Sequence, residues 1–102
     1  MIELDAEIEF EPGTELTPGW RGLLDFGEVW SESDAELWPS GSGDLPVGEP
    51  LTYGCQLLVS DDSPRHWRLL LWAIDHPRDV MRSGAALTLL EGQTSRAVGR
   101  LV

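Results

Sequence analysis

The chain has 102 residues, of which 41% are hydrophobic and 25% charged, values typical of a single soluble globular domain. Its one cysteine excludes an internal disulfide, and no apolar run approaches the ~20 residues that a membrane helix needs. The opening residues, Met1-Ile2-Glu3-Leu4-Asp5, lack the basic start and apolar centre of a signal peptide. We therefore expect a cytoplasmic protein without membrane association.

The net charge of −11 is divided unevenly along the chain. Residues 1–50 hold 13 acidic residues and one arginine, a net charge of −12, whereas residues 51–102 hold five acidic residues and six arginines. An acidic half repels the phosphates of nucleic acids and favours a cationic partner. A high net charge also keeps proteins in solution without any partner, and the sequence leaves both interpretations open.

An alternating segment opens the chain. Period two over the ten residues from Ile2 to Glu11 predicts a strand with one buried face and one face in water. Carboxylates on the water face would stand ~6.8 Å apart, less than the ~8 Å screening length of physiological salt. They are therefore predicted to act as one negative stripe. Its members are Glu3, Asp5, Glu7, Glu9 and Glu11.

The next segments predict further strands. The run from Trp20 to Trp30 changes phase near Gly27, which indicates a bulge. A short strand is predicted at Ala35 to Trp38, before a loop rich in glycine and serine at residues 39–44. Alternation returns from Leu51 to Val59 and predicts another strand.

The last third of the chain completes the predicted fold. A turn at Asp61–Pro64 leads into an apolar strand at residues 67–74, and one helical turn is predicted at residues 78–82. A final hairpin joins residues 85–90 to residues 95–102 across Glu91-Gly92-Gln93-Thr94. Short strands separated by turns predict a single all-β domain over residues 1–102, a closed or nearly closed antiparallel barrel of six to seven strands.

The C-terminal pattern resembles a known family. His76-Pro77, then Gly84, Glu91-Gly92 and Arg96-Ala97-Val98-Gly99 follow the spacing found at the end of the C-terminal β-barrel domain of translation elongation factor Tu. The opening strand and the segment Leu16–Gly22 match the start of that domain, so the resemblance covers most of the chain in order. The segment 51–59 is an additional strand that the family pattern does not require. The resemblance implies the barrel fold in a small stand-alone protein.

The resemblance does not extend to the GTPase part of that family. The chain has no lysine, so it lacks the phosphate-binding loop G-x-x-x-x-G-K-[ST]. Cys55, His66 and His76 show no metal-binding spacing, and we expect Cys55 in the core. A solvated row of carboxylates gives each acid nearly the same surroundings, which does not separate a general acid from a general base. We therefore predict no catalytic residue, no metal and no cofactor.

Non-enzymatic binding of a basic protein is the favoured function. The acidic stripe would form the interface, and it suits an immunity-type protein that neutralises a basic toxin or an accessory subunit of a translation-related assembly. Trp67 and Trp72 fall on opposite faces of their strand, so one of them is available as an interface anchor, although tryptophans also fill small cores.

The alternative function is a translation-factor-like RNA or tRNA binder. Its basic patch would consist of Arg65, Arg68, Arg78, Arg82, Arg96 and Arg100. The negative field of the whole chain and the lack of interleaved aromatic and basic residues disfavour nucleic-acid binding.

Overall fold

The computed structural model describes residues 1–39, 41–59, 65–72, 74 and 77–102. This described part contains six strands and one short 3-10 helix. The strands are β1 (Ile2–Phe10), β2 (Arg21–Val29), β3 (Pro50–Leu58), β4 (His66–Leu71), β5 (Ala86–Glu91) and β6 (Thr94–Leu101), and the helix is η1 (Glu32–Leu37). Within these ranges no helix has the length and apolar character needed to cross a membrane.

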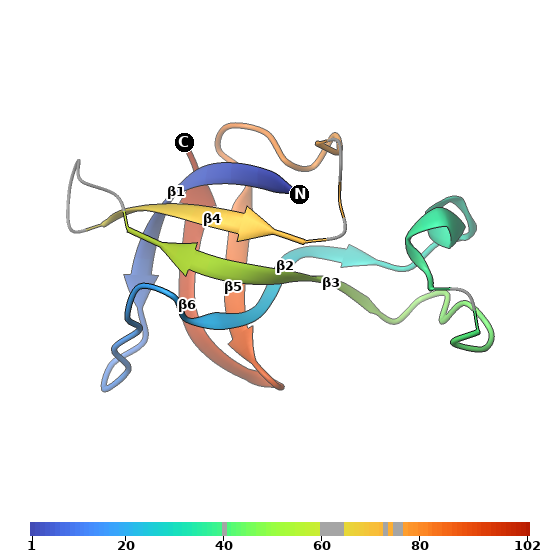
Figure 1. Cartoon of the computed structure of the whole chain (residues 1–102), viewed down its shortest axis with the longest axis horizontal. Coiled ribbons are helices and arrows are strands. Elements are labelled where there is room, and N and C mark those ends of the chain that lie inside the picture. The colour runs from blue at the N-terminus through green and yellow to red at the C-terminus, as the bar shows by residue number, and fades with distance from the viewer. Residues whose placement is uncertain (40, 60–64, 73, 75–76) are drawn as a thin grey trace.

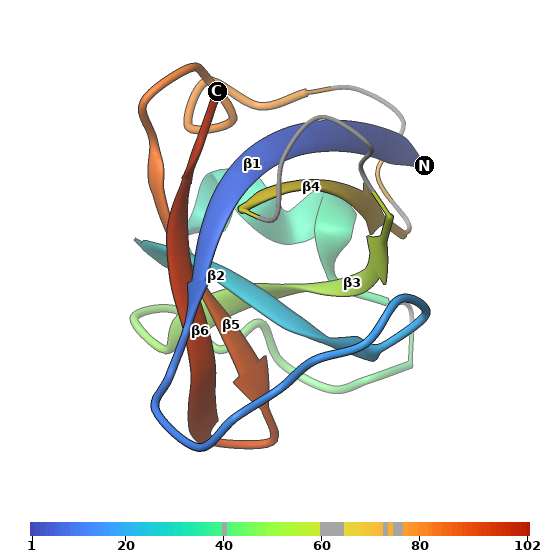
Figure 2. The ribbon, with the colours of Figure 1, turned by 90° about the vertical axis from the view of Figure 1, so that its left-hand side faces the viewer.

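The six strands form one closed antiparallel barrel, which confirms the predicted fold class. Their order around the barrel is β1-β4-β3-β2-β5-β6, and β1 closes the ring by pairing with both β4 and β6 (Figure 2). The connection from β2 to β3 includes η1, and its described residues, 30–39 and 41–49, project from one end of the barrel (Figure 1). We call residues 30–39 and 41–49 the arm. The molecule measures 41 × 27 × 21 Å, and the arm lies at one end of its long axis.

The barrel interior is filled by the apolar members of the alternating strands. In β3, Leu51, Tyr53, Cys55 and Leu57 are buried, whereas the residues between them are half-buried. Each fully buried leucine stabilises the fold by roughly 1.5–3 kcal/mol relative to an exposed one. The most deeply buried large side chains are Leu24, Leu51, Leu57, Leu69, Leu71, Leu89 and Cys55.

The bulge predicted near Gly27 is present in β2. The pairing of β2 with β3 changes register between Asp25 and Val29, and Gly27 has a φ of +84°, which favours glycine. Asp25 stabilises the bulge, because its Oδ1 accepts a hydrogen bond of 2.7 Å from the Gly27 N–H. The bulge turns the end of β2 away from the barrel wall and toward the arm (Figure 1).

The strand predicted at Ala35 to Trp38 is wrong, because these residues belong to η1 and its C-terminal end. The N–H and the hydroxyl of Ser31 both donate to Asp34 Oδ2, each over 2.9 Å. These bonds satisfy backbone and side-chain groups at the start of a helix. The four residues Ala35-Glu36-Leu37-Trp38 do not alternate, so they carry no strand signal that outweighs this helix start.

The other strand predictions agree with the structure to within a few residues. The additional strand predicted at residues 51–59 is β3, and the strand predicted at residues 67–74 is β4, which ends at Leu71. Residues 78–82, where one helical turn is predicted, form a hydrogen-bonded turn but no helix, with the Met81 N–H bonded to the Arg78 carbonyl over 2.8 Å. His76 and the turn predicted at Asp61–Pro64 lie outside the described residues.

Candidate functional site

The predicted acidic row lies on the outer surface of the barrel. Glu3, Asp5, Glu7 and Glu9 are exposed on β1, and Glu11 just beyond it is half-buried. On one side of the row, β4 places Arg68 opposite Asp5. Arg68 Nε lies 3.6 Å from Asp5 Oδ1, and Arg68 Nη1 lies 3.8 Å from Glu3 Oε2.

On the other side of the row, β6 supplies a second arginine. Arg100 lies opposite Glu7 in the register, with its Nη2 3.1 Å from Glu7 Oε2. Each of these exposed pairs contributes only ~0–1 kcal/mol to stability, but together they change the electrostatic character of the surface. The row is a ladder of mixed charge rather than the uniformly negative stripe that the sequence predicts.

Two further contacts complete this ladder. His66 Nε2 lies 3.6 Å from Asp5 Oδ1, and Ser95 Oγ lies 3.3 Å from Glu11 Oε1. Among the five predicted acids, Glu9 is the one that has no ion pair or side-chain hydrogen bond within the described part of the chain.

The structure divides the predicted basic patch among several carboxylates. Besides the two arginines of the ladder, Arg96 pairs with Glu91 at the β5–β6 hairpin over 2.9 Å. Arg78 pairs with two acids at the base of the arm. Arg65 and Arg82 are exposed. Four of the six arginines thus form ion pairs with acidic residues.

Trp67 and Trp72 do lie on opposite faces, and both are half-buried. Trp67 packs against the core and lies 5.8 Å from the Phe10 ring, measured between centroids. Trp72 lies on the outer side, where Arg21 stands 5.1 Å above its ring. Trp72 is therefore the better placed of the two to contact a partner.

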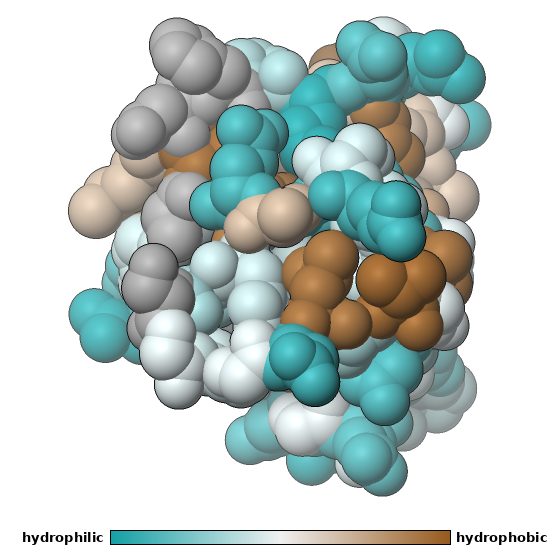
Figure 3. Space-filling model, turned by 90° about the vertical axis from the view of Figure 1, so that its right-hand side faces the viewer, coloured by the Kyte–Doolittle hydropathy of each residue, from teal (hydrophilic) through white to brown (hydrophobic). Residues whose placement is uncertain are grey.

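The arm carries a second set of acidic residues, separate from those of the ladder. Residues 30–49 contain five acidic residues and no basic one. Four of these acids are exposed: Glu32, Glu36, Asp44 and Glu49. Val47 in the arm and Val29 at the adjoining end of β2 are 57% and 54% exposed. Figure 3 faces this end of the molecule and shows hydrophobic side chains gathered beside hydrophilic ones.

A tryptophan pair organises the interior of the arm. Trp30 and Trp38 form an edge-to-face contact with ring centroids 5.2 Å apart and an interplanar angle of 80°. Trp38 Nε1 donates to the Gly43 carbonyl over 3.0 Å. The Trp30 N–H donates to the Glu49 carbonyl, and the Gly48 N–H donates to the Trp30 carbonyl, each over 2.8 Å. The arm is thus an ordered element with its own packing.

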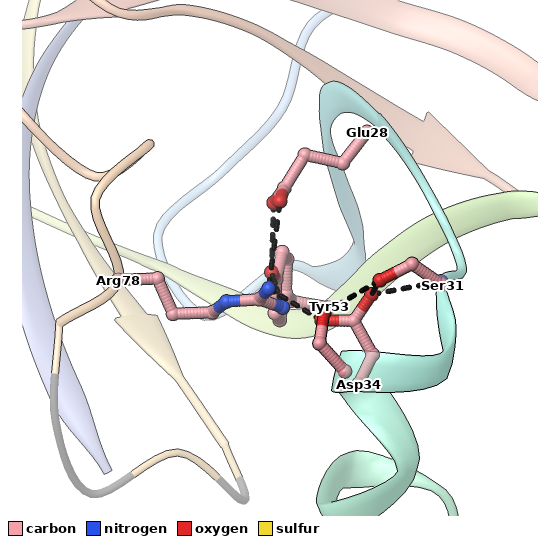
Figure 4. Close-up of polar contacts among 6 residues, drawn as sticks. Glu28, Ser31, Asp34, Tyr53 and Arg78 are labelled. Atoms are coloured by element: carbon pink, nitrogen blue, oxygen red, sulfur yellow. Dashed lines mark hydrogen bonds and ion pairs between the residues drawn. The ribbon is translucent and has the colours of Figure 1, made fainter.

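Arg78 joins the base of the arm to the connection between β4 and β5 (Figure 4). Its guanidinium forms an ion pair with the buried carboxylate of Asp34 and lies 3.7 Å from Glu28 Oε2. Arg78 Nη1 also donates to the Tyr53 hydroxyl over 3.0 Å, and that hydroxyl donates to Glu28 Oε1 over 2.9 Å. We call Glu28, Asp34, Tyr53 and Arg78 the arm latch.

The arm latch combines residue types that enzymes use, but its protonation states suit a structural role. Hydrogen bonds from Ser31 and Arg78 lower the pKa of Asp34, against the effect of burial, so its carboxylate stays charged. Burial and the neighbouring Glu28 raise the pKa of Tyr53, so its hydroxyl stays protonated. A general base needs a pKa near the working pH, and neither group meets that requirement.

The environment of Cys55 is also that of a core residue. Cys55 is fully buried, and burial raises the pKa of its thiol to about 12, which suppresses the reactive thiolate. Within the described ranges, no group of three or more histidine, cysteine, aspartate and glutamate side chains is placed to hold a metal ion.

A groove of about 690 Å³ opens on the barrel surface where β2 separates from β5. Its charged lining consists of Glu7, Glu9, Asp25, Arg65 and Arg100. A second cavity of about 420 Å³ adjoins it, because both are lined by Phe26, Gly84 and Ala86. The groove thus brings part of the predicted acidic row together with two predicted arginines.

The arm latch and the groove were both missed by sequence reasoning. The Ser31-x-x-Asp34 spacing was a usable signal for the start of η1. For the groove, the bulge predicted at Gly27 was a weaker sequence signal. A bulge indicates that two strands separate, but it does not indicate where the gap lies.

Comparisons of the chain with known protein families, with curated proteins and with solved structures give no match. The fold and the geometry of its surfaces therefore carry the functional argument.

Proposed function

We propose that this protein is a non-enzymatic binding module that presents acidic groups to a basic protein partner. The observation that carries the proposal is the arm together with the adjoining end of β2, where four exposed carboxylates and two exposed valines occur and where residues 30–49 contain no basic residue. Protein interfaces combine an apolar centre with a polar rim, and charge complementarity guides their association. The arm offers both features on one ordered element.

The acidic ladder on β1 is a second surface for the same partner. Its arginine pairs reduce its net charge, so we place the stronger electrostatic attraction at the arm. An immunity-type protein and an accessory subunit of a translation-related assembly are both consistent with this proposal. The latter follows from the resemblance to the C-terminal domain of elongation factor Tu.

The experiment that tests the proposal is affinity capture from cell lysate with two matched variants. The arm variant carries Glu32→Gln, Glu36→Gln and Asp44→Asn, and the control variant carries Glu15→Gln, Asp79→Asn and Glu91→Gln, which are exposed acids outside the arm, the ladder and the groove. Both variants change the net charge by the same amount. We expect a basic protein that elutes at moderate salt, with an affinity about tenfold lower for the arm variant and nearly unchanged for the control.

Two results would contradict the proposal. Equal loss in both variants would mean that only net charge matters, and the arm would have no specific role. Capture that disappears after nuclease treatment would favour the RNA-linked alternative instead.

A further inference from the structure

The wall of the barrel is incomplete between β2 and β5. Their pairing ends at Asp25 and Thr88, although β5 begins earlier, at Ala86. The cause is the bulge in β2. There the Gly27 N–H is bonded to the Asp25 side chain and does not continue the main-chain hydrogen bonding between the strands. The groove lies at this gap and is lined by Ala86, Leu87 and Thr88.

The alternation of main-chain hydrogen bonds along β5 directs the N–H and C=O of one residue into the gap. The Leu101 N–H donates to the Ala85 carbonyl over 2.9 Å, so Ala85 directs its carbonyl toward β6. Main-chain groups of successive residues in an antiparallel strand point to opposite sides. The N–H and C=O of Ala86 are therefore directed away from β6, toward the part of the seam that β2 leaves uncovered.

The lining of the groove sets the charge of a suitable ligand. Glu7 and Arg100 pair with each other, which leaves Glu9 and Asp25 beside Arg65. Apolar surface comes from Phe26 and from Val98, which is 43% exposed. The groove volume of about 690 Å³ lies within the range of roughly 300–1,000 Å³ that is typical of ligand pockets. A short peptide with a cationic side chain fits this combination.

We propose that the groove binds an extended basic segment of the protein partner. The segment adds as a short strand to the edge of β5 at Ala86, and its arginine or lysine side chains lie toward the acids on the two sides of the groove, Asp25 on β2 and Glu9 on β1. Strand addition of this kind takes its affinity from main-chain hydrogen bonds and its specificity from alternate side chains. This inference rests on the proposed function. It adds that one segment of the basic partner binds in an extended conformation.

The test is an NMR titration of the isotope-labelled full chain with the peptide acetyl-Val-Arg-Val-Arg-Val-amide. We expect amide shift changes that centre on Ala86, Leu87 and Glu9, and none with the same peptide carrying glutamate for arginine. The Ala86→Pro variant removes the donor at a position where a strand edge tolerates proline. We expect it to bind about fivefold more weakly, whereas Ala86→Ser keeps the N–H and binds like the native protein.

The possible failures separate this inference from the proposed function. Shift changes confined to the arm would overturn the groove site and leave the binding function intact. Equal affinity of the Ala86→Pro and Ala86→Ser variants for the peptide, or no binding of the peptide, would also overturn the groove site. The capture experiment with the arm variant would then decide the proposed binding function independently. If Ala86→Pro does not fold, a peptide with N-methylated alternate amides replaces it, and unweakened binding of that peptide overturns the inference. Dimerisation abolished by Ala86→Pro would assign the edge to a second copy of the chain and overturn it too.

Discussion

Arg78 and Asp34 are 44 residues apart in the chain, and their ion pair fastens the arm to the connection between β4 and β5. The Asp34 side chain is only 4% exposed, whereas that of Arg78 is 29% exposed. The pair therefore combines a buried anion with a cation that keeps partial access to water. Tyr53 joins the same group from β3 and Glu28 joins it from β2, so four segments meet at the arm latch.

Removal of Arg78 should destabilise the fold strongly. The Arg78→Ala variant leaves the buried carboxylate of Asp34 without its cation, and we expect a loss of about 3 kcal/mol in the free energy of unfolding. Urea denaturation followed by tryptophan fluorescence measures this loss. Arg82→Ala is the matched control, because Arg82 is exposed and its replacement should cost less than about 0.5 kcal/mol. Equal unfolding midpoints for the two variants would contradict the role of the arm latch.

Stability should depend on pH through Asp34. Hydrogen bonds from Ser31 and Arg78 hold the folded-state pKa of Asp34 below its ordinary value of 3.8. Such a carboxyl stabilises the fold above pH 3.8, and this contribution is lost as the pH falls through the folded-state pKa. The measurement is the difference in unfolding free energy between the native protein and Asp34→Asn. We expect a large difference at about pH 6 that shrinks below about pH 3.

The control for this pH effect is Asp44→Asn, which removes an exposed carboxylate from the same arm. Its replacement should change stability by less than about 0.5 kcal/mol at either pH. An Asp34→Asn difference that stays constant with pH would show that the loss comes from altered packing and not from the charge.

Tyr53 should resist ionisation until the protein unfolds. It is the only tyrosine, so the near-ultraviolet phenolate absorbance reports on this residue alone. Burial raises its pKa and Glu28 raises it further, so the stability that depends on its neutral hydroxyl falls as the pH rises above 10.0. We expect phenolate formation to coincide with unfolding seen by circular dichroism, whereas in denaturant Tyr53 should titrate near 10.0. Phenolate in the folded protein at that pH would contradict this prediction.

Gly99 should tolerate no side chain, because β1 and β6 approach each other closely there. A Cβ at this position would lie 2.1 Å from the Glu7 carbonyl oxygen, so the Gly99→Ala variant must shift backbone. We expect a loss of about 3 kcal/mol, measured as a lower midpoint of thermal unfolding. At Gly54 a Cβ would lie 3.2 Å from the Trp72 side chain, which can move, so Gly54→Ala should cost about 1 kcal/mol or less. Similar losses in both variants would contradict the close approach.

Local patterns in the sequence predict most of the barrel. Alternation identified β1 and β3 because each has one face in the core, and the phase change at Gly27 located the bulge. The strand prediction at Ala35 to Trp38 was wrong because this short segment has no strict alternation, whereas the hydrogen bonds of Ser31 to Asp34 favour a short helix.

The surfaces could not be predicted in the same way, because their contacts join distant parts of the chain. The pair of Arg100 with Glu7 spans 93 residues, and nothing local indicates that β1 lies between β4 and β6. The sequence therefore assigns the acidic row and the basic patch to two alternative functions. In the structure, Arg68 and Arg100 from the basic patch adjoin the acidic row.

The position of β1 between β4 and β6 has a consequence for the growing chain. Neither partner strand exists while residues 11–65 are being synthesised, so β1 then has two uncovered edges and an apolar face. Uncovered strands of this kind pair with copies of themselves and aggregate. Like charges opposite one another oppose such pairing, and β1 carries an acid at every second position from Glu3 to Glu9. The carboxylates that pair with Arg68 and Arg100 in the folded protein therefore also disfavour self-association of the unfinished chain.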